Sequence, residues 1–356
     1  MARVAVVFTG GTISMRHDVA AGGNVPVLGG DALLSTVPGL DRIAEVVPID
    51  LGLTPASHFQ FDALFDVHRA VSDAVARDDV DGAVVVQGTD AIEETSFFLD
   101  LLHAGRKPVV VTGAMRSASQ PGYDGPRNLA DAVRVAASPA VATADPGVVV
   151  VLAGTIEPAD DVTKTHASAF DTFRSLDTGP IGRVGGGDVV LSRVRGPRRH
   201  VTASRAATRV FLVTATVATD GTPLAALRAA GADGFVVAAT GAGNTDPSLL
   251  AAAEAAIADG LPVVLATRCP AGAAGAGYAF AGGGATWLRA GAILAGHLTG
   301  PKARIALALG LGAGLDGDRL ADLLADPAPI HDPDWFWSDA PAADDDASLA
   351  SLLGDR

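Results

Sequence analysis

The sequence contains a single cysteine, and its histidines are scattered. One thiol, Cys269, excludes an internal disulfide and a thiolate-rich zinc site. We expect this cysteine to be a small buried hydrophobic residue. None of the eight histidines shows His-Glu-x-x-His spacing. The sequence therefore predicts no metal site.

The chain is also short of basic residues. Its 26 lysines and arginines stand against 40 aspartates and glutamates, which gives a formal net charge of −14. A surface of that sign repels phosphate backbones, and the sequence has no basic stripe to offset it. We therefore expect no nucleic-acid partner.

Long apolar segments are missing as well. The alanine-rich stretches of the second half are interrupted by glycine, aspartate and arginine too often to span a bilayer. The first predicted strand begins almost at Met1, which leaves no room for the three regions of a signal peptide. We expect a cytoplasmic protein without a membrane partner.

The chain does have enough apolar residues for two cores. Hydrophobic residues make up 49% of its 356 residues and charged residues 19%, so the sequence is that of a globular protein, and its length favours two domains. Short apolar runs alternate with segments in which apolar residues have helical spacing. The first half has expected strands at Ala5–Phe8, Ile43–Val47, Ala83–Val86, Val109–Thr112 and Gly147–Leu152, and expected helices at Asp62–Arg77, Ile92–Ala104 and Pro126–Ala137.

This alternation, with its runs of valine, predicts parallel sheets covered by helices on both faces. It is interrupted from about Gly185 to Thr208, where glycines and arginines indicate a linker or a surface excursion, and it then resumes. The predicted fold class is α/β, with two doubly wound domains on mainly parallel sheets, the larger N-terminal and the smaller C-terminal. The expected boundaries are 1–190 for the N-terminal domain, 191–207 for the linker, 208–330 for the C-terminal domain and 331–356 for a peripheral acidic tail.

Two glycine-threonine turns follow predicted strands one βα unit apart. Thr9-Gly10-Gly11-Thr12-Ile13 ends the first strand, and Gly88-Thr89-Asp90 follows the strand at Ala83–Val86. Glycines let the backbone bend sharply, and ligands of such sheets bind beyond the carboxyl ends of the strands. The two threonines are therefore expected to form a catalytic pair.

Three further motifs follow in order: Thr112-Gly113-Ala114-Met115-Arg116, Val162-Thr163-Lys164-Thr165 and Gly241-Ala242-Gly243-Asn244. With the two turns, this ordered set resembles the bacterial asparaginase/glutaminase family, and in particular its cytoplasmic branch. These are two-domain amidohydrolases that release ammonia from amide side chains. The resemblance covers nearly the whole chain except the tail. In the third motif, Arg116 is expected to pair with an acid such as Asp124.

The resemblance implies a set of catalytic residues. Thr12 would be the nucleophile that forms an acyl-enzyme, after Gly11, which lets the substrate approach closely. Thr89, Lys164 and Asp90 would activate a hydroxyl or a water, with a neutral lysine as the base. Asp90 would also bind the α-ammonium group of the substrate.

The resemblance implies substrate contacts too. Backbone N–H groups near Gly88-Thr89 and Ala114 would polarise the scissile carbonyl. Ser57, or His58 if the register slips by one, would bind the substrate carboxylate. Family members assemble as homodimers or tetramers, and Asn244 would line the site of a neighbouring subunit. No cofactor is implied.

Each of these residues has a simpler interpretation. Thr12 fits a helix N-cap, and Asp90 fits a cap with Glu93 three residues later in a capping box. Lys164 lies in a polar stretch that is typical of solvated surface lysines. Asn244 fits a left-handed turn equally well. Taken singly the caps are favoured, whereas the joint order and spacing favour the catalytic set.

The sequence departs from the family pattern at two places. The family carries a mobile lid with a tyrosine that closes over the nucleophile, whereas here Asn24 occupies that position, and an amide cannot act as a general base. His17, in the same segment, is either an alternative base or an ordinary solvent-facing residue. No acid occurs between residues 268 and 278, where many family members place a glutamate. Loss of both residues shifts proton transfer to the Thr89-Lys164-Asp90 trio, or indicates another substrate.

The sequence therefore predicts an amidohydrolase that converts asparagine to aspartate and ammonia through a Thr12 acyl-enzyme, without cofactor or metal. The missing tyrosine and acid leave two alternatives open. One is a catalytically weak amino-acid sensor on the same fold, and the other is an amidase for another small amide, such as glutamine or a D-amino-acid amide. A dinucleotide-binding oxidoreductase is disfavoured, because neither glycine turn reads Gly-x-Gly-x-x-Gly.

Overall fold

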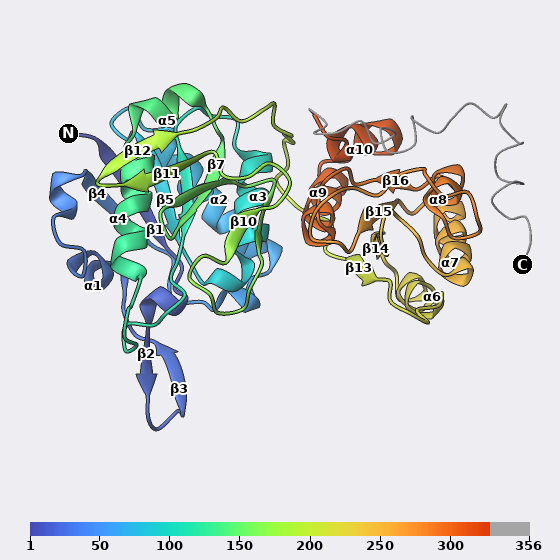
Figure 1. The fold of residues 1–356 in the computed structure, drawn as a ribbon, viewed down its shortest axis with the longest axis horizontal. Coiled ribbons are helices and arrows are strands. Elements are labelled where there is room, and N and C mark those ends of the chain that lie inside the picture. Colours follow the sequence, from blue (N-terminus) through green and yellow to red (C-terminus); the bar gives the residue numbers. More distant parts are fainter. Residues whose placement is uncertain (328–356) are drawn as a thin grey trace, which may run out of the picture.

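The computed structural model describes residues 1–327, which form two α/β domains (Figure 1). The first domain is built on an eight-stranded sheet in the order β12-β11-β8-β7-β6-β5-β1-β4. Its strands are β1 (Arg3–Phe8), β4 (Glu45–Asp50), β5 (Gly82–Val86), β6 (Val109–Thr112), β7 (Val148–Leu152), β8 (Thr155–Pro158), β11 (Gly182–Gly185) and β12 (Asp188–Leu191). Two short sheets accompany it, β2 (Met15–Asp18) with β3 (Gly23–Pro26), and β9 (Val162–Lys164) with β10 (Phe173–Ser175).

The main sheet is parallel over most of its width. Strands β4, β1, β5, β6 and β7 run in one direction, whereas β8, β11 and β12 are joined to them by antiparallel pairing. The central strands are rich in valine and alanine and are buried along nearly their whole length, as expected for strands covered on both faces. Helices α2 (Phe61–Val75) and α3 (Ile92–Leu102) cover one face, and α1 (Gly30–Ser35), α4 (Gly125–Ala136) and α5 (Pro139–Ala144) the other.

The second domain repeats this plan on a smaller scale. Strands β13 (Val210–Thr214), β14 (Gly234–Ala239), β15 (Val263–Thr267) and β16 (Ile293–Leu294) pair in parallel in that order. Helices α6 (Thr222–Ala229), α7 (Pro247–Ala258) and α8 (Gly284–Arg289) cover one face, α9 (Gly300–Gly312) covers the face toward the first domain, and α10 (Gly317–Leu324) packs against α9. The predicted two-domain α/β fold is confirmed.

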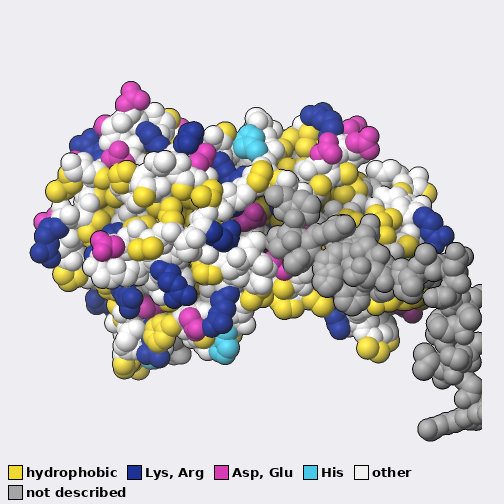
Figure 2. Space-filling view, turned by 45° about the horizontal axis from the view of Figure 1, so that its top comes forward, with side chains coloured by type: hydrophobic (Ala, Val, Ile, Leu, Met, Phe, Trp, Pro, Cys, Tyr) yellow, Lys and Arg dark blue, Asp and Glu magenta, His cyan; other side chains and the backbone are white. Residues whose placement is uncertain are grey.

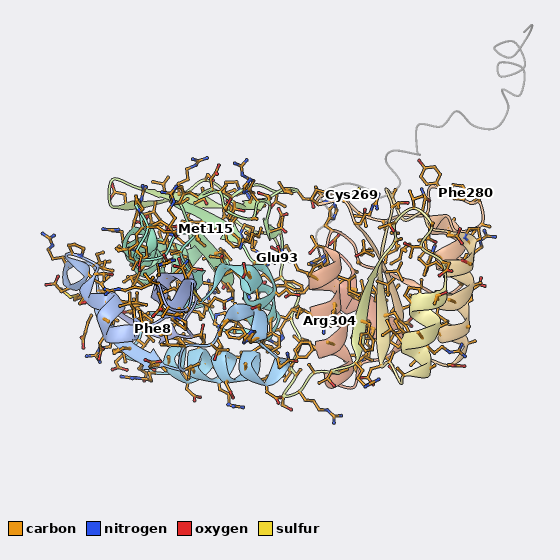
Figure 3. All side chains as sticks on the ribbon, turned by 90° about the horizontal axis from the view of Figure 1, so that it is seen from below. Phe8, Glu93, Met115, Cys269, Phe280 and Arg304 are labelled. Carbon is orange, nitrogen blue, oxygen red and sulfur yellow. The ribbon has the colours of Figure 1, made fainter. Side chains whose placement is uncertain are left out.

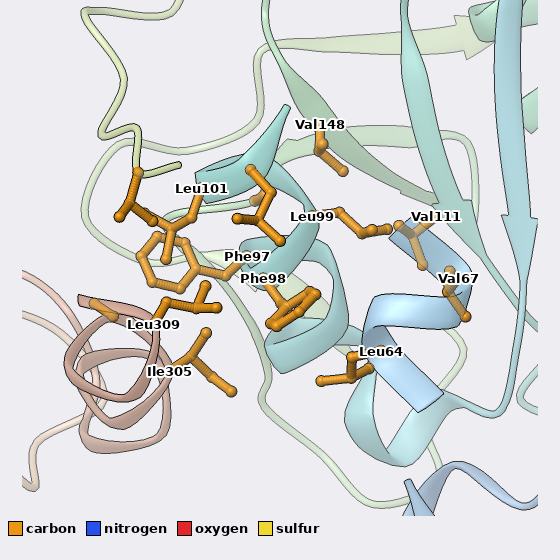
Figure 4. Close-up of a cluster of buried hydrophobic side chains, with 14 of the residues drawn as sticks. Leu64, Val67, Phe97, Phe98, Leu99, Leu101, Val111, Val148, Ile305 and Leu309 are labelled. Atoms are coloured by element: carbon orange, nitrogen blue, oxygen red, sulfur yellow. The ribbon is translucent and has the colours of Figure 1, made fainter. Parts of the chain in front are cut away.

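A shared hydrophobic core joins the two domains. Phe97 and Leu101 of α3 lie against Ile305 and Leu309 of α9, and all four side chains are almost completely buried (Figure 4). Burial of apolar surface stabilises by roughly 25 cal/mol per Å². The domains are therefore held together by packed side chains and not only by the segment that connects them.

The connecting segment is itself tied to both domains by ion pairs. The Arg195 side chain is 4% exposed and contacts Asp100 at 2.7 Å and Asp160 at 2.8 Å. Arg199 pairs with Asp326, beyond the end of α10. Removing one partner of such a buried pair is strongly destabilising, so this segment is a structural part of the junction.

Two expected elements differ from the structure. The glycines at 185–187, which were expected to begin a linker, form the turn of the β11–β12 hairpin, where Gly186 and Gly187 have φ of +63° and +95°. Positive φ at both central positions is typical of tight hairpin turns. The strand expected at Ile43–Val47 is β4, which begins at Glu45, because Ile43 still belongs to the end of a 3₁₀ turn.

Cys269 is exposed, so its expected burial is wrong (Figure 3). It comes two residues after the end of β15, where its backbone N–H donates to the Thr267 hydroxyl and the chain turns away from the sheet. On the face drawn in Figure 2, acidic and basic side chains lie among one another. No helix within residues 1–327 is long and apolar enough to cross a membrane. The tail expected at 331–356 lies outside the described residues.

Candidate active site

The first glycine-threonine turn follows the carboxyl end of β1. Gly10 and Gly11 have φ of +102° and +94°, values that residues with a Cβ rarely adopt. Thr12 begins a 3₁₀ turn whose N-cap is Gly11, so the interpretation of Thr12 as the cap is wrong. The Thr12 side chain is half-buried and makes no hydrogen bond within residues 1–327. Its hydroxyl is therefore available for a reaction.

The second turn touches the first. β1 and β5 are adjacent parallel strands, so the turns that follow them emerge at the same edge of the sheet. A Cβ on Gly11 would lie 2.1 Å from the backbone nitrogen of Gly88. Only glycine fits at that position. The contact brings Thr12 and Thr89, the next residue of each turn, into one region.

Lys164 reaches this edge from β9. Its ammonium group donates to Thr89 Oγ1 at 3.0 Å and to Asp90 Oδ1 at 2.7 Å. The Lys164 side chain is 16% exposed, so it is not a solvated surface lysine, whereas the Asp90 side chain is 73% exposed. Asp90 makes no side-chain cap bond, and the N-cap of α3 is Ala91. The structure brings the three predicted residues together and rules out the helix cap for Asp90.

Glu93 binds the strand that carries the lysine. Its carboxylate accepts hydrogen bonds from Thr163 Oγ1 at 2.5 Å and from the backbone N–H of Lys164 at 2.9 Å. The capping box expected between Glu93 and Asp90 does not form at the start of α3. Glu93 instead ties α3 to β9 and fixes the backbone from which Lys164 extends.

The third motif is held in place by Asp124 and Asn128. The Asp124 carboxylate accepts the backbone N–H groups of Arg116 and the residue before it, each at 3.0 Å. Asn128 donates to the Gly113 carbonyl at 3.0 Å and to Asp124 at 2.9 Å. The expected contact between Arg116 and Asp124 thus runs through the backbone of Arg116. It fixes the loop that contains Ala114.

Two backbone N–H groups at this edge have no acceptor among the described residues. Those of Thr89 and Ala114 donate to no group within residues 1–327, although both residues are buried and buried backbone groups are nearly always paired. A Cβ on Gly113 would lie 3.2 Å from Thr89 Cγ2, so the two loops are in contact. The two donors are suited to bind an oxygen of a ligand.

The residues expected to bind a substrate carboxylate lie beside the second turn. Ser57 and His58 belong to a 3₁₀ turn, Ala56–His58, and both are exposed. A Cβ on Gly88 would lie 3.0 Å from the Cβ of Ala56. Ser57 therefore directly follows a residue that contacts the second turn.

The segment expected to form a lid is a β-hairpin, β2–β3, which extends from the first domain (Figure 1). His17 and Asn24 pair across this hairpin, and both are exposed. Near its base, the Tyr123 phenol donates to the carbonyl of Ile13 at 2.7 Å. Burial raises the pKa of Tyr123 to about 12, so this phenol acts as a hydrogen-bond donor and not as a base.

Asn244 lies in the second domain, in the turn after β14. Its backbone forms a bridge with Thr240, with N–H to carbonyl distances of 3.0 Å and 2.9 Å. Gly241 and Gly243 carry the positive φ values of this turn, and Asn244 does not, so its left-handed interpretation is wrong. Its place in the site of a neighbouring subunit stays a prediction.

Sequence analysis assigns no role to two residues close to the site, Tyr123 and Lys302. Lys302, in α9, is completely buried and donates to the carbonyl of Val162 at 2.6 Å. Apart from Arg304, Lys302 is the one charged residue in the apolar sequence of α9, and this is a signal that points to it. No local signal marks the contact of Tyr123 with Ile13, because those residues are far apart in the chain.

Comparison with known families finds matches in both domains. The family described as "Asparaginase, N-terminal" matches residues 3–195, and "Glutaminase/Asparaginase C-terminal domain" matches residues 209–324. The first match contains all the first-domain site residues named above, and the second contains Asn244 and Lys302.

Individual relatives agree with these matches. The chain is 40% identical over 332 residues to a probable L-asparaginase of Deinococcus radiodurans. The aligned region covers 89% of this chain and 96% of that protein. The chain is 33% identical over 279 residues to L-asparaginase 2 of Escherichia coli, with 76% and 79% covered. A crystal structure of a probable cytoplasmic L-asparaginase from Campylobacter jejuni is similar with a TM-score of 0.83 and 27% identity, and covers 91% of this chain and 99% of that one. The chain belongs to the asparaginase family.

Proposed function

We propose that this protein is an L-asparaginase, which hydrolyses the side-chain amide of asparagine to aspartate and ammonia. The observation that carries the proposal is the contact of the two glycine-threonine turns, with Lys164 bound to Thr89 and with a Thr12 hydroxyl that has no partner within residues 1–327. Acyl transfer needs such a nucleophile with a base nearby. The L-asparaginase names of the relatives and of the solved structure support asparagine as the substrate.

The proposed reaction begins at Thr12. Its Oγ1 attacks the side-chain carbonyl carbon, and the backbone N–H groups of Thr89 and Ala114 stabilise the resulting oxyanion. The Thr12 proton passes through Thr89 to the Lys164 side chain, which contacts Thr89, and then to the leaving nitrogen, which departs as ammonia. Water next attacks the acyl-threonine ester, with the same lysine as base, and releases aspartate.

The remaining predicted residues position the substrate. The exposed Asp90 carboxylate, which Lys164 already contacts, binds the α-ammonium group. Ser57, with His58 beside it, binds the α-carboxylate. The absence of a Cβ at Gly11 does not open space for the substrate, contrary to the expectation from the sequence; it lets the backbone of Gly88 pack against the first turn and brings Thr89 toward Thr12.

We further propose that the chain forms a homodimer or a tetramer, in which Asn244 lines a neighbouring site. The family resemblance supports this assembly. The description of the Campylobacter jejuni protein as cytoplasmic supports a cytoplasmic location. Sedimentation of the purified protein measures the assembly, and Asn244→Ala measures the contribution across the contact.

The test is ammonia release from asparagine. Thr12→Ala is expected to lower kcat by about 10⁴-fold or more, on the scale of nucleophile removal in a serine protease, and Lys164→Met by about 10²–10⁴-fold. Thr143→Ala, on an exposed face of α5, is the matched control and keeps the wild-type rate. Equal rates for wild type and Thr12→Ala overturn the nucleophile assignment.

A substrate panel separates the alternatives. Asparagine, glutamine, D-asparagine and a peptide-bound amide are each scored for ammonia, and asparagine is expected to be hydrolysed fastest. The amino-acid sensor predicts a different result, namely tight aspartate binding in calorimetry with negligible turnover at millimolar asparagine. That result contradicts the enzymatic proposal.

A further inference from the structure

Lys302 is a lysine in a place where lysine is costly. It lies on α9 of the second domain with its side chain completely buried. Burial lowers the pKa of Lys302 to about 8, although Glu93, Asp160 and Asp161 act to raise it and Arg195 acts to lower it further. Burying a charged ammonium group costs free energy, because the group loses its hydration. The group that Lys302 binds is therefore informative.

Lys302 binds the strand that carries Lys164. Its Nζ crosses the domain junction and donates to the carbonyl of Val162 at 2.6 Å. Val162 begins β9 and Lys164 ends it. Further along the same strand, the Glu93 carboxylate accepts hydrogen bonds from the Thr163 hydroxyl and from the backbone N–H of Lys164. The two domains thus hold this strand from different elements, α9 and α3.

Backbone pairing alone gives this strand little support, although its Val162 side chain is buried in the core. β9 is three residues long and pairs with one strand, β10, within the described chain. Isolated two-stranded pairs are marginally stable in water. Lys164 sits at the last position of β9, so the placement of its ammonium group depends on how firmly the strand is held.

We propose that Lys302 and Glu93 are positioning residues for Lys164, and that the second domain, through Lys302, sets the position of the base of the first-domain site. This inference rests on the proposed function, because it takes Lys164 to be the base. Neither side chain contacts Thr12 or Thr89 through a hydrogen bond within the described residues. Both act on the reaction through the backbone of β9.

Arg304 offers a matched control. It lies two residues after Lys302 on the same helix and also reaches the first domain, with its guanidinium carbon 5.5 Å from the centre of the Phe61 ring. Its Nε donates to the Val210 carbonyl at 2.8 Å and not to β9. Figure 3 labels Glu93 and Arg304 on the two sides of the domain junction.

The test compares Lys302→Met, Lys302→Arg and Arg304→Met in asparagine hydrolysis. Displacing a reacting group by about 1 Å costs roughly 10²-fold in rate, so Lys302→Met is expected to lower kcat by about that factor with KM within about threefold. Lys302→Arg keeps a donor and recovers part of kcat, and Arg304→Met stays within about threefold of the wild-type kcat. Amide hydrogen exchange of the peptide that contains Lys164 is expected to be faster in Lys302→Met than in Arg304→Met.

The exchange readout does not depend on activity, so the two proposals can fail separately. Equal kcat values and equal exchange for Lys302→Met and Arg304→Met overturn the positioning role. If Lys164→Met hydrolyses asparagine as fast as wild type, the proposed base is wrong, whereas faster exchange in Lys302→Met still shows the anchoring of β9. Thermal unfolding verifies that each variant folds. Should Lys302→Met fail to fold, Glu93→Ala tests the strand from its other anchor, and unchanged kcat and exchange there overturn the proposal as well.

Discussion

Replacing Gly11 with alanine is expected to push the two glycine-threonine turns apart. The new Cβ would lie 2.1 Å from the nitrogen and 2.3 Å from the Cα of Gly88, and 2.6 Å from the carbonyl carbon of Gln87. Ordinary contact begins at 3.4 Å, so one turn has to move by about 1.3 Å. All three atoms belong to the backbone, which cannot rotate out of the way as a side chain can.

The movement separates Thr12 from Thr89 and from the donors at the oxyanion position. A displacement of about 1 Å lowers the rate by roughly 10²-fold, which corresponds to about 2.7 kcal/mol of transition-state stabilisation. At φ +94° and ψ −175°, the backbone of Gly11 lies in a region that is essentially restricted to glycine, so a residue with a Cβ adds strain of about 1–3 kcal/mol there. At roughly 2–4 °C per kcal/mol, we expect Tm to fall by several degrees.

Gly52→Ala is the control for this variant. Gly52 has a similar φ, +98°, and no atom lies within 4 Å of its Cβ position. The substitution therefore adds strain at a positive φ without the collision, so it should lower Tm while kcat/KM stays within about threefold of wild type. The measurements are ammonia release and thermal unfolding. Wild-type kcat/KM in Gly11→Ala, or an equal loss of activity in both variants, refutes the reasoning.

Two further predictions concern His297 and Tyr123. The hydrogen bond to Asp326 raises the pKa of His297, so its stabilisation is complete below the unfolded-state value of about 6.5 and is lost as the pH rises through the folded-state pKa. Tm of the wild type should therefore fall as the pH rises over that range, and it should fall less in His297→Asn. If Tm depends on pH in the same way in both proteins, the His297–Asp326 pair does not contribute as described. Tyr123→Phe removes the donor to Ile13 and should lower kcat/KM by about tenfold with an unchanged pH profile. A shifted profile would show that the phenol is a base, contrary to its pKa of about 12.

The sequence predicts the two turns well because local rules apply to them. Valine-rich strands are buried and parallel, parallel neighbours end at the same edge, and glycines before Thr12 and Thr89 let their backbones meet. The closeness of the proposed nucleophile and its partner hydroxyl follows from these rules and from the motif order.

The anchors of Lys164 do not follow from local rules. Glu93 stands where a capping box is expected, yet its carboxylate binds a strand about seventy residues later. Lys302 meets that strand from the other domain. Such contacts depend on how α3, β9 and α9 pack, which no short window of sequence contains. The predicted burial of Cys269 is wrong for the same reason. The general preference of cysteine for burial takes no account of where the chain leaves the sheet after β15.

The central claim, that Thr12 forms an acyl-enzyme, is tested most directly by the mass of the protein during turnover. Wild-type enzyme is mixed with saturating asparagine, quenched in acid within the first turnovers, digested and analysed by mass spectrometry. We predict an aspartyl ester on the peptide that contains Thr12, and none in Thr12→Ala. An ester on Thr89 instead, or a burst of ammonia without any acylated peptide, contradicts the account.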